Sequence, residues 1–130
     1  MLVHPVAEWA VHVFVLHRRR VAADGRIKES FSARTHRQHH EDPKDVDLVL
    51  LPVSVTAGLV GGAVAAAASA PDRRRGATGA VVGLLSLLAY EWVHFLIHAP
   101  YQPRGGWYRS RWRAHRLHHY RNEQYWYGVV

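Results

Sequence analysis

Histidine is the residue type with the most chemistry to offer in this chain, because it occupies 11 of the 130 positions. Ten of these residues form four clusters that alternate between a pair and a triplet. The clustered residues are His12, His17, His36, His39, His40, His94, His98, His115, His118 and His119. Imidazole binds zinc, copper, iron and nickel, and ten rings are more than one ion can use. The clusters therefore predict a site for two metal ions, with His4 left without a role.

The spacing within each cluster indicates which rings can meet on a helix. His94 and His98 are four residues apart, so their side chains stand about 40° apart and can address one point. Each triplet has offsets that place its rings on one side of a helical turn, within reach of one or two shared ions. His12 and His17 are five residues apart, which is about 140° on a regular helix. We expect this pair to bind different metals or to span a helix end.

Two acidic residues stand close to the histidine pairs, and each is followed by tryptophan. Glu8 precedes the first pair and Glu91 precedes the second. A carboxylate at these positions can orient the imidazole N–H groups of metal ligands. Alternatively, the two Glu-Trp dipeptides can act as anchors at a membrane interface. The order of Glu-Trp, pair and triplet occurs in both halves of the chain, through either duplication or convergence.

Two apolar blocks predict the elements that carry these clusters. Residues 48–70 contain no charged side chain. As a helix they would rise about 34 Å, which exceeds the roughly 30 Å of a hydrocarbon core. Residues 76–97 form the second candidate span, and the short connection between the two blocks predicts an antiparallel hairpin. The pairs Gly58/Gly62 and Gly79/Gly83 are expected to let the two helices approach closely. The alternative is a hairpin whose small residues fill the core of a soluble protein.

The distribution of basic residues predicts the orientation of this hairpin. Three of the 17 Lys and Arg residues lie in the connection, and the other 14 flank the open ends. The positive-inside rule then places the open ends, with the histidines, in the cytoplasm. The remaining sequence predicts helices over about residues 6–19 and 107–120, a short helical or loop segment through His39 and His40, and no strand. The expected fold class is all-α, an integral-membrane helical hairpin capped on its cytosolic side by histidine-bearing helices.

Composition excludes several other classes of site. The absence of cysteine excludes a disulfide scaffold, a thiolate zinc finger, an iron–sulfur cluster and a cysteine nucleophile. The net charge of +7 fits either nucleic acid or an anionic membrane surface. Because the basic residues surround apolar spans and form no recognition helix, we expect a membrane and no nucleic-acid partner.

From Glu8 to Val129 the chain resembles the fatty acid hydroxylase/sterol desaturase superfamily of integral-membrane oxygenases. The resemblance lies in the segments HVFVLH, HRQHHEDP, EWVHFLIHAPYQPR and HRLHHYRNEQYWYGV, of which the last two are most similar to bacterial fatty acid hydroxylase-type members. It implies a single domain over residues 1–130, truncated at both ends relative to its relatives. It also implies a dinuclear centre on the cytosolic face, in which the ten clustered histidines hold two metal ions, iron or, on isolation, zinc.

The same resemblance implies O2-dependent hydroxylation of a lipid acyl chain. No amino-acid side chain attacks an unactivated C–H bond, so we expect no catalytic residue beyond the metal ligands. The alternatives are a carotenoid ring or sterol hydroxylase or desaturase of the same superfamily, and a non-catalytic metal-binding membrane protein. The expected partners are the lipid substrate, with the basic aromatic residues 104–121 at its headgroups, and a separate electron donor, a ferredoxin or a cytochrome. A separate donor is needed because His4-Pro5 lacks the Gly-Gly of a haem-domain motif.

Overall fold

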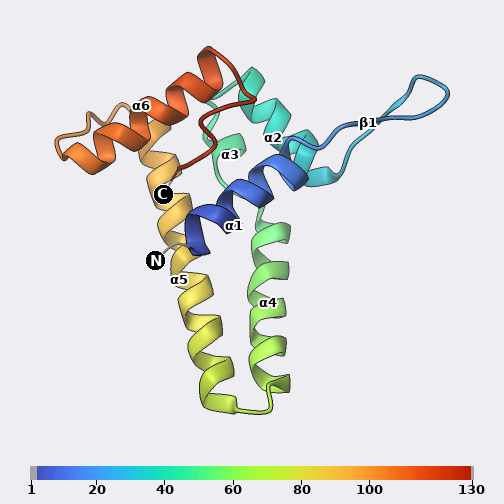
Figure 1. Ribbon diagram of the computed structural model, residues 1–130, viewed down its shortest axis with the longest axis vertical. Helices are drawn as coiled ribbons and strands as arrows, with labels where there is room; N and C mark the ends of the chain where they lie inside the picture. The colour runs from blue at the N-terminus through green and yellow to red at the C-terminus, as the bar shows by residue number, and fades with distance from the viewer. Residues whose placement is uncertain (1–2, 130) are drawn as a thin grey trace.

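The computed structural model describes residues 3–129, with side chains from Val6 onward. This part of the chain is mostly helical, and it forms a long hairpin with shorter helices gathered across its open end (Figure 1). The all-α prediction is confirmed, apart from one small β-hairpin. In chain order the elements are α1 (Val3–Val11), the π-helical turn η1 (His12–Leu16), β1 (Arg20–Val21), β2 (Ile27–Lys28), α2 (Phe31–Glu41), α3 (Val46–Val49), α4 (Val53–Ser69), α5 (Arg73–His98) and α6 (Gly106–Tyr120).

The long hairpin consists of α4 and α5, and it presents an apolar surface to its surroundings. The stretches Val46–Ser69 and Arg73–His98 are long and apolar enough to cross a membrane, and only 6% and 11% of their most apolar parts are buried within the molecule. Apolar side chains such as Val64 and Leu85 are therefore exposed, as expected of helices that face lipid and not of a soluble core. These helices agree with the predicted spans at 48–70 and 76–97 within a few residues.

The connection between the two long helices depends on one cap and one glycine. The Asp72 carboxylate accepts hydrogen bonds from the main-chain N–H groups of Arg74 and Arg75 at 3.0 and 3.2 Å, which satisfies the first turn of α5. A Cβ atom at Gly76 would lie 2.6 Å from the Cβ atom of Ala70. Only glycine therefore allows the chain to reverse this tightly.

The glycine pairs that predicted close helix packing do not provide it. At Gly58, Gly62, Gly79 and Gly83, an added Cβ atom would meet no heavy atom within 4 Å in the described structure. The prediction that these pairs bring α4 and α5 together is therefore wrong. The tight approach occurs at Gly76 instead, because the two helices meet most closely where the short connection forces the chain to turn.

The interior at the open end of the hairpin is built largely from histidine. Among the described residues, the buried apolar side chains are Ala33, Val49, Ile97 and Val129. The buried histidines are His12, His36, His39, His94, His115 and His118. In Figure 1, α1, α2 and α6 surround this region above α4 and α5. Polar rings thus occupy the place that aliphatic side chains fill in most small domains.

A two-stranded antiparallel β-hairpin projects from this helical region, and the prediction of no strand is wrong for its residues. Arg20 pairs with Lys28, and Val21 pairs with Ile27. The turn contains Gly25 at a φ of 77°, a conformation that glycine adopts without strain. The Asp-Gly dipeptide in this turn is typical of a β-hairpin, and it was the sequence signal that could have predicted these strands.

Candidate metal centre

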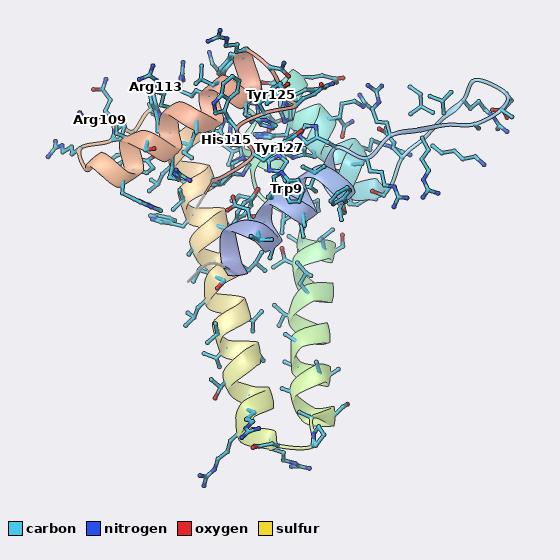
Figure 2. All side chains as sticks on the ribbon, viewed as in Figure 1. Trp9, Arg109, Arg113, His115, Tyr125 and Tyr127 are labelled. Atoms are coloured by element: carbon cyan, nitrogen blue, oxygen red, sulfur yellow. The ribbon has the colours of Figure 1, made fainter. Side chains whose placement is uncertain are left out.

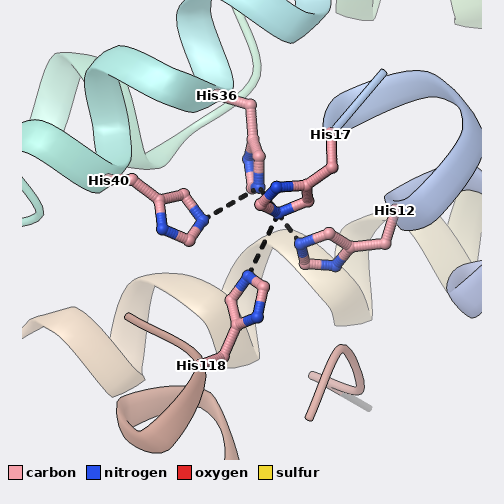
Figure 3. A group of neighbouring side chains, drawn as sticks. All are labelled: His12, His17, His36, His40 and His118. Carbon is pink, nitrogen blue, oxygen red and sulfur yellow. Dashed lines mark hydrogen bonds between the residues drawn. The ribbon is translucent and has the colours of Figure 1, made fainter. Parts of the chain in front are cut away.

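The clustered histidines come together from four segments of the chain into two groups. The first histidine group consists of His12, His17, His36, His40 and His118, and Figure 3 shows their rings converging. The second histidine group consists of His39, His94, His98, His115 and His119. Within each group, one ring nitrogen per residue lies within 4.8 Å of all the others. All ten predicted ligands are thus positioned where they could hold metal ions.

Each histidine triplet is divided between the two groups. In α2, His36 and His40 belong to the first group, whereas His39 belongs to the second. In α6, His118 belongs to the first group and its neighbour His119 to the second. Adjacent residues on a helix point about 100° apart, so neighbouring rings reach different centres. The groups also touch, because the His40 and His119 rings stack with centroids 4.1 Å apart.

The first pair meets through a local change in helix type. The main-chain N–H of His17 donates to the carbonyl of His12 at 2.9 Å, which closes a π-helical turn of five residues. The two rings lie nearly parallel with centroids 5.1 Å apart. The expectation that His12 and His17 bind different metals is wrong, because the wider turn places both in one group. The alternative, that the pair spans a helix end, agrees with the position of His17 directly after η1.

The spacing of the ring nitrogens fits adjacent ligands of a metal ion. His36 Nε2 lies 3.1 Å from His12 Nε2, 3.1 Å from His17 Nε2 and 3.2 Å from His40 Nε2. One ring nitrogen carries a single proton or a single lone pair, so it cannot satisfy three such contacts by hydrogen bonding. Metal–nitrogen bonds of about 2.1 Å place adjacent ligands about 3.0 Å apart at right angles and about 3.4 Å apart in a tetrahedron. The observed distances are nearer to the right-angled arrangement.

The second group repeats this geometry around His115. Its Nε2 atom lies 3.1 Å from those of His94 and His98, and 3.0 Å from that of His119. The fifth member, His39, is only 1% exposed, and neither of its ring nitrogens has a hydrogen-bond partner among the described residues. A buried polar ring without partners is costly unless something binds it. The donor set and this unsatisfied ring therefore fit a metal ion in the second group.

Burial keeps these imidazoles in the form that binds metal. Loss of contact with water, reinforced by repulsion from neighbouring histidines, lowers the pKa of His12 and His40 to about 2 and that of His39 to about 3. The pKa values of His36 and His115 are lowered by the same causes. At neutral pH these rings carry no proton on the nitrogen that a metal ion would need.

The family model for fatty acid hydroxylase matches residues 1–130. The chain belongs to the fatty acid hydroxylase family. This agrees with the resemblance inferred from the histidine segments, and it implies an enzyme of the oxygenase or hydroxylase kind. No curated protein and no solved structure matches the chain. Histidine groups at the end of two helices of membrane-spanning length fit a histidine-ligated metal hydroxylase of the membrane.

In this fatty acid hydroxylase family member, the two predicted accessory carboxylates bind main-chain groups from distant segments. Glu91 accepts a hydrogen bond from the N–H of Leu51 at 2.8 Å, and Glu8 accepts one from the N–H of Val129. Glu91 therefore connects α5 to the segment that precedes α4, and Glu8 connects the helix that leads into η1 to the end of the described chain. Their role in orienting imidazole N–H groups stays a prediction.

The histidine groups lie between an apolar cavity and a polar one. The apolar cavity has a volume of about 440 Å³ and lies among α1, α4 and α5, with Leu51 and Leu87 in its wall. Histidines of both groups, His12 and His94 among them, line it as well. The polar cavity, of about 340 Å³, is lined by His40 and by charged residues that include Glu29 and Glu123. The histidines therefore contribute to the lining of both an apolar and a polar cavity.

Sequence reasoning missed two contributors to the first group, both after α6. The carbonyl oxygen of Tyr125 accepts a hydrogen bond from His118 Nδ1 at 2.8 Å. A carbonyl can only accept, so His118 carries its proton on Nδ1 and directs the Nε2 lone pair toward the group. The Tyr127 ring packs against the first group at the same place. The only sequence signal was the aromatic segment YWYGV itself, which lies outside the histidine clusters.

Proposed function

We propose that this protein hydroxylates an alkyl carbon of a membrane lipid, with an acyl chain as the substrate, using dioxygen and two metal ions, one in each histidine group. The observation that carries this proposal is the apolar cavity, whose mostly aliphatic lining includes histidines of both groups. An acyl chain in this cavity would bring a C–H bond to the donor atoms, and the aliphatic walls would exclude water from it. Iron bound there would supply the oxidising chemistry that protein side chains lack.

The proposal favours iron over zinc because of the number and spacing of the donors. Five nitrogen donors exceed the four of a typical zinc site. The distances of 3.0–3.2 Å also suit adjacent ligands at right angles better than tetrahedral ones. A set of five donors arranged in this way leaves room for a further ligand. Metal analysis of the isolated protein tests whether the bound metal is iron or zinc.

The orientation and the reductant are further parts of this proposal. Arg73, Arg74 and Arg75 form the first turn of α5, next to the hairpin connection, and the remaining excess of basic residues lies at the histidine end. By the positive-inside rule the histidine end faces the cytoplasm. Hydroxylation with O2 needs two electrons and two protons, and it releases the second oxygen atom as water. A separate ferredoxin or cytochrome would supply the electrons.

The outer face of α6 suits an acidic redox protein. Figure 2 shows Arg109 and Arg113 pointing away from the α4–α5 hairpin, and Arg116 is exposed on the same helix. Basic side chains at these positions would steer a negatively charged donor toward the helix that carries His115 and His118.

The decisive experiment measures both metal content and lipid products. The protein is expressed in a host fed with 18O2, and its lipids are compared with those of a host that expresses His98→Ala. We expect two iron ions per purified native chain. We also expect hydroxylated acyl chains that carry 18O in the host with the native protein and not in the host with His98→Ala. Labelled carotenoids or sterols with unchanged acyl chains would reassign the substrate. Bound metal without any labelled product would favour the non-catalytic alternative, and absence of metal would refute the proposal.

A further inference from the structure

The segment after α6 folds back over the first histidine group. We call residues 125–129 the C-terminal strap. Val129 is fully buried, and its main-chain N–H donates to the carboxylate of Glu8 on α1, 121 positions earlier in the chain. The strap is thus attached at one end to α6 and at the other to the helix that leads into η1 (Figure 1).

The side chain of Tyr127 covers three of the five rings in the first group. Its ring centroid lies 5.3 Å from that of His12, 5.7 Å from that of His17 and 5.3 Å from that of His118. Aromatic rings at these separations pack favourably and restrict each other's rotation. Among the described ring contacts of Tyr127, none involves the second histidine group. The Tyr127 ring therefore contacts the first group directly and the second group only through it.

The strap backbone adopts an unusual conformation at the residue between its two contacts with the group. Trp126 has a φ of 58°, which is the left-handed region that a bulky residue rarely enters. On one side of it, the Tyr125 carbonyl binds His118 Nδ1, and on the other side lies the Tyr127 ring. A strained residue of this kind persists only when the surrounding contacts require it. Here the conformation of Trp126 lets the Tyr125 carbonyl and the Tyr127 side chain both face histidines of the first group.

We infer that the C-terminal strap is a positioning element for the metal ion of the first histidine group. Tyr125 holds the His118 ring with its Nε2 lone pair toward the ion, and Tyr127 keeps His12, His17 and His118 in place around it. The second histidine group has no such dependence on the strap. This inference rests on the proposed function only in requiring that each group binds a metal ion.

Replacement of Tyr127 tests the contribution of its ring. In Tyr127→Ala the ring is lost, and we expect the purified protein to keep one metal ion per chain, with the affinity of the other lowered about 10- to 100-fold. Tyr127→Phe retains the ring and is expected to bind both ions as the native chain does. The double variant Tyr127→Ala/His118→Ala should lose no further ion, because both changes act on the same group. Tyr127→Ala/His98→Ala should lose both.

Replacement of Trp126 tests the backbone separately. Trp126→Gly adopts a positive φ without strain, so it should keep both ions. Proline cannot adopt a φ of 58°, so Trp126→Pro should displace the Tyr125 carbonyl and lose one ion. Metal content by mass spectrometry and helix content by circular dichroism are measured on each detergent-purified variant.

The outcomes separate this inference from the proposed function. If the native chain binds no metal, the proposed function fails first. If the native chain binds two ions and both Tyr127→Ala and Trp126→Pro also bind two with native affinity, the strap has no positioning role. If either variant loses both ions with its helix content unchanged, the strap does not act selectively on the first group, and the inference is wrong.

Discussion

The two histidine groups have the same number and kind of donors, but the chain builds them in different ways. The second group takes all five of its rings from regular helices: His39 from α2, and the pairs His94/His98 and His115/His119 from α5 and α6. The first group depends on the π-helical turn between His12 and His17, and on the strap that carries Tyr127. Regular helical spacing is thus sufficient for one centre, whereas the other needs irregular backbone from both ends of the described chain.

This difference has a structural origin. α5 is a helix of 26 residues, and its last turns carry His94 and His98 out of the hairpin in a fixed direction. η1 has only five residues and leads directly into the exposed β-hairpin. A short element at the edge of the fold orients its side chains less firmly than a long helix does, unless other segments hold it. The strap and the Glu8 contact provide that support.

Removal of the central ring of each group should have the largest effect. His36 and His115 each contact three other ring nitrogens within their own group. We expect His36→Ala to lose the first ion and His115→Ala the second, and each to lower hydroxylation at least about 100-fold. Metal analysis and product analysis by mass spectrometry measure the two effects. Equal loss of both ions in each variant would show that the groups do not bind independently.

Deletion of one residue between the members of each pair should affect the groups unequally. Deletion of Phe14 can convert the π turn into a regular α turn, which keeps the two flanking rings about 40° apart and the following chain in phase. Deletion of Phe95 instead rotates the end of α5 by about 100° relative to its start. We expect the first deletion to keep two ions and the second to lose one. Phe14→Ala and Phe95→Ala, which preserve chain length, serve as matched controls in the same metal analysis.

Acid should weaken the metal-free fold through both groups alike. An unfolded histidine has a pKa near 6.5, whereas burial lowers the pKa of His40 to about 2 and that of His39 to about 3. Below pH 6.5 the unfolded chain therefore binds protons that the folded chain does not. The free energy of unfolding should fall as pH decreases, by about 1.4 kcal/mol per pH unit for each such ring.

Chemical denaturation of the metal-depleted protein between pH 7 and pH 4.5 measures this slope. His40→Ala, in the first group, and His39→Ala, in the second, should each flatten it by the same amount. A flattening by only one of the two variants would show that the other ring is already protonated in the metal-free fold.

The smallest expected effect concerns α2, the helix that serves both groups. The Ser30 hydroxyl caps α2 by accepting a hydrogen bond from the N–H of Ala33 at 3.1 Å. Ser30→Ala should lower the free energy of unfolding by about 1 kcal/mol. Because α2 contributes to both groups, the affinities for both ions should fall together and slightly. Isothermal titration of the metal-depleted variant, with Ser32→Ala as the control, measures this, and a change at one site alone would contradict it.

The helical spans and the second group were the most predictable parts of the molecule. An uncharged apolar block defines a membrane-length helix without reference to the rest of the fold, and the spacing of His94 and His98 requires only a regular turn. The β-hairpin and the π turn were missed because both depart from the simple periodicities on which the predictions were based. The roles of Tyr125 and Tyr127 could not be predicted either. One of them acts through its carbonyl oxygen, which every residue has.

The sequence alone predicted two metal ions with histidine nitrogen as their donor, and it determined that two apolar helices stand beside the histidines. These properties follow from residue type and local spacing. The tertiary structure alone decided that His39 joins a different group from His36 and His40, and that the strap covers one group only. The reason is that a helix fixes the direction in which each ring points, whereas the packing of several helices decides which of those rings meet.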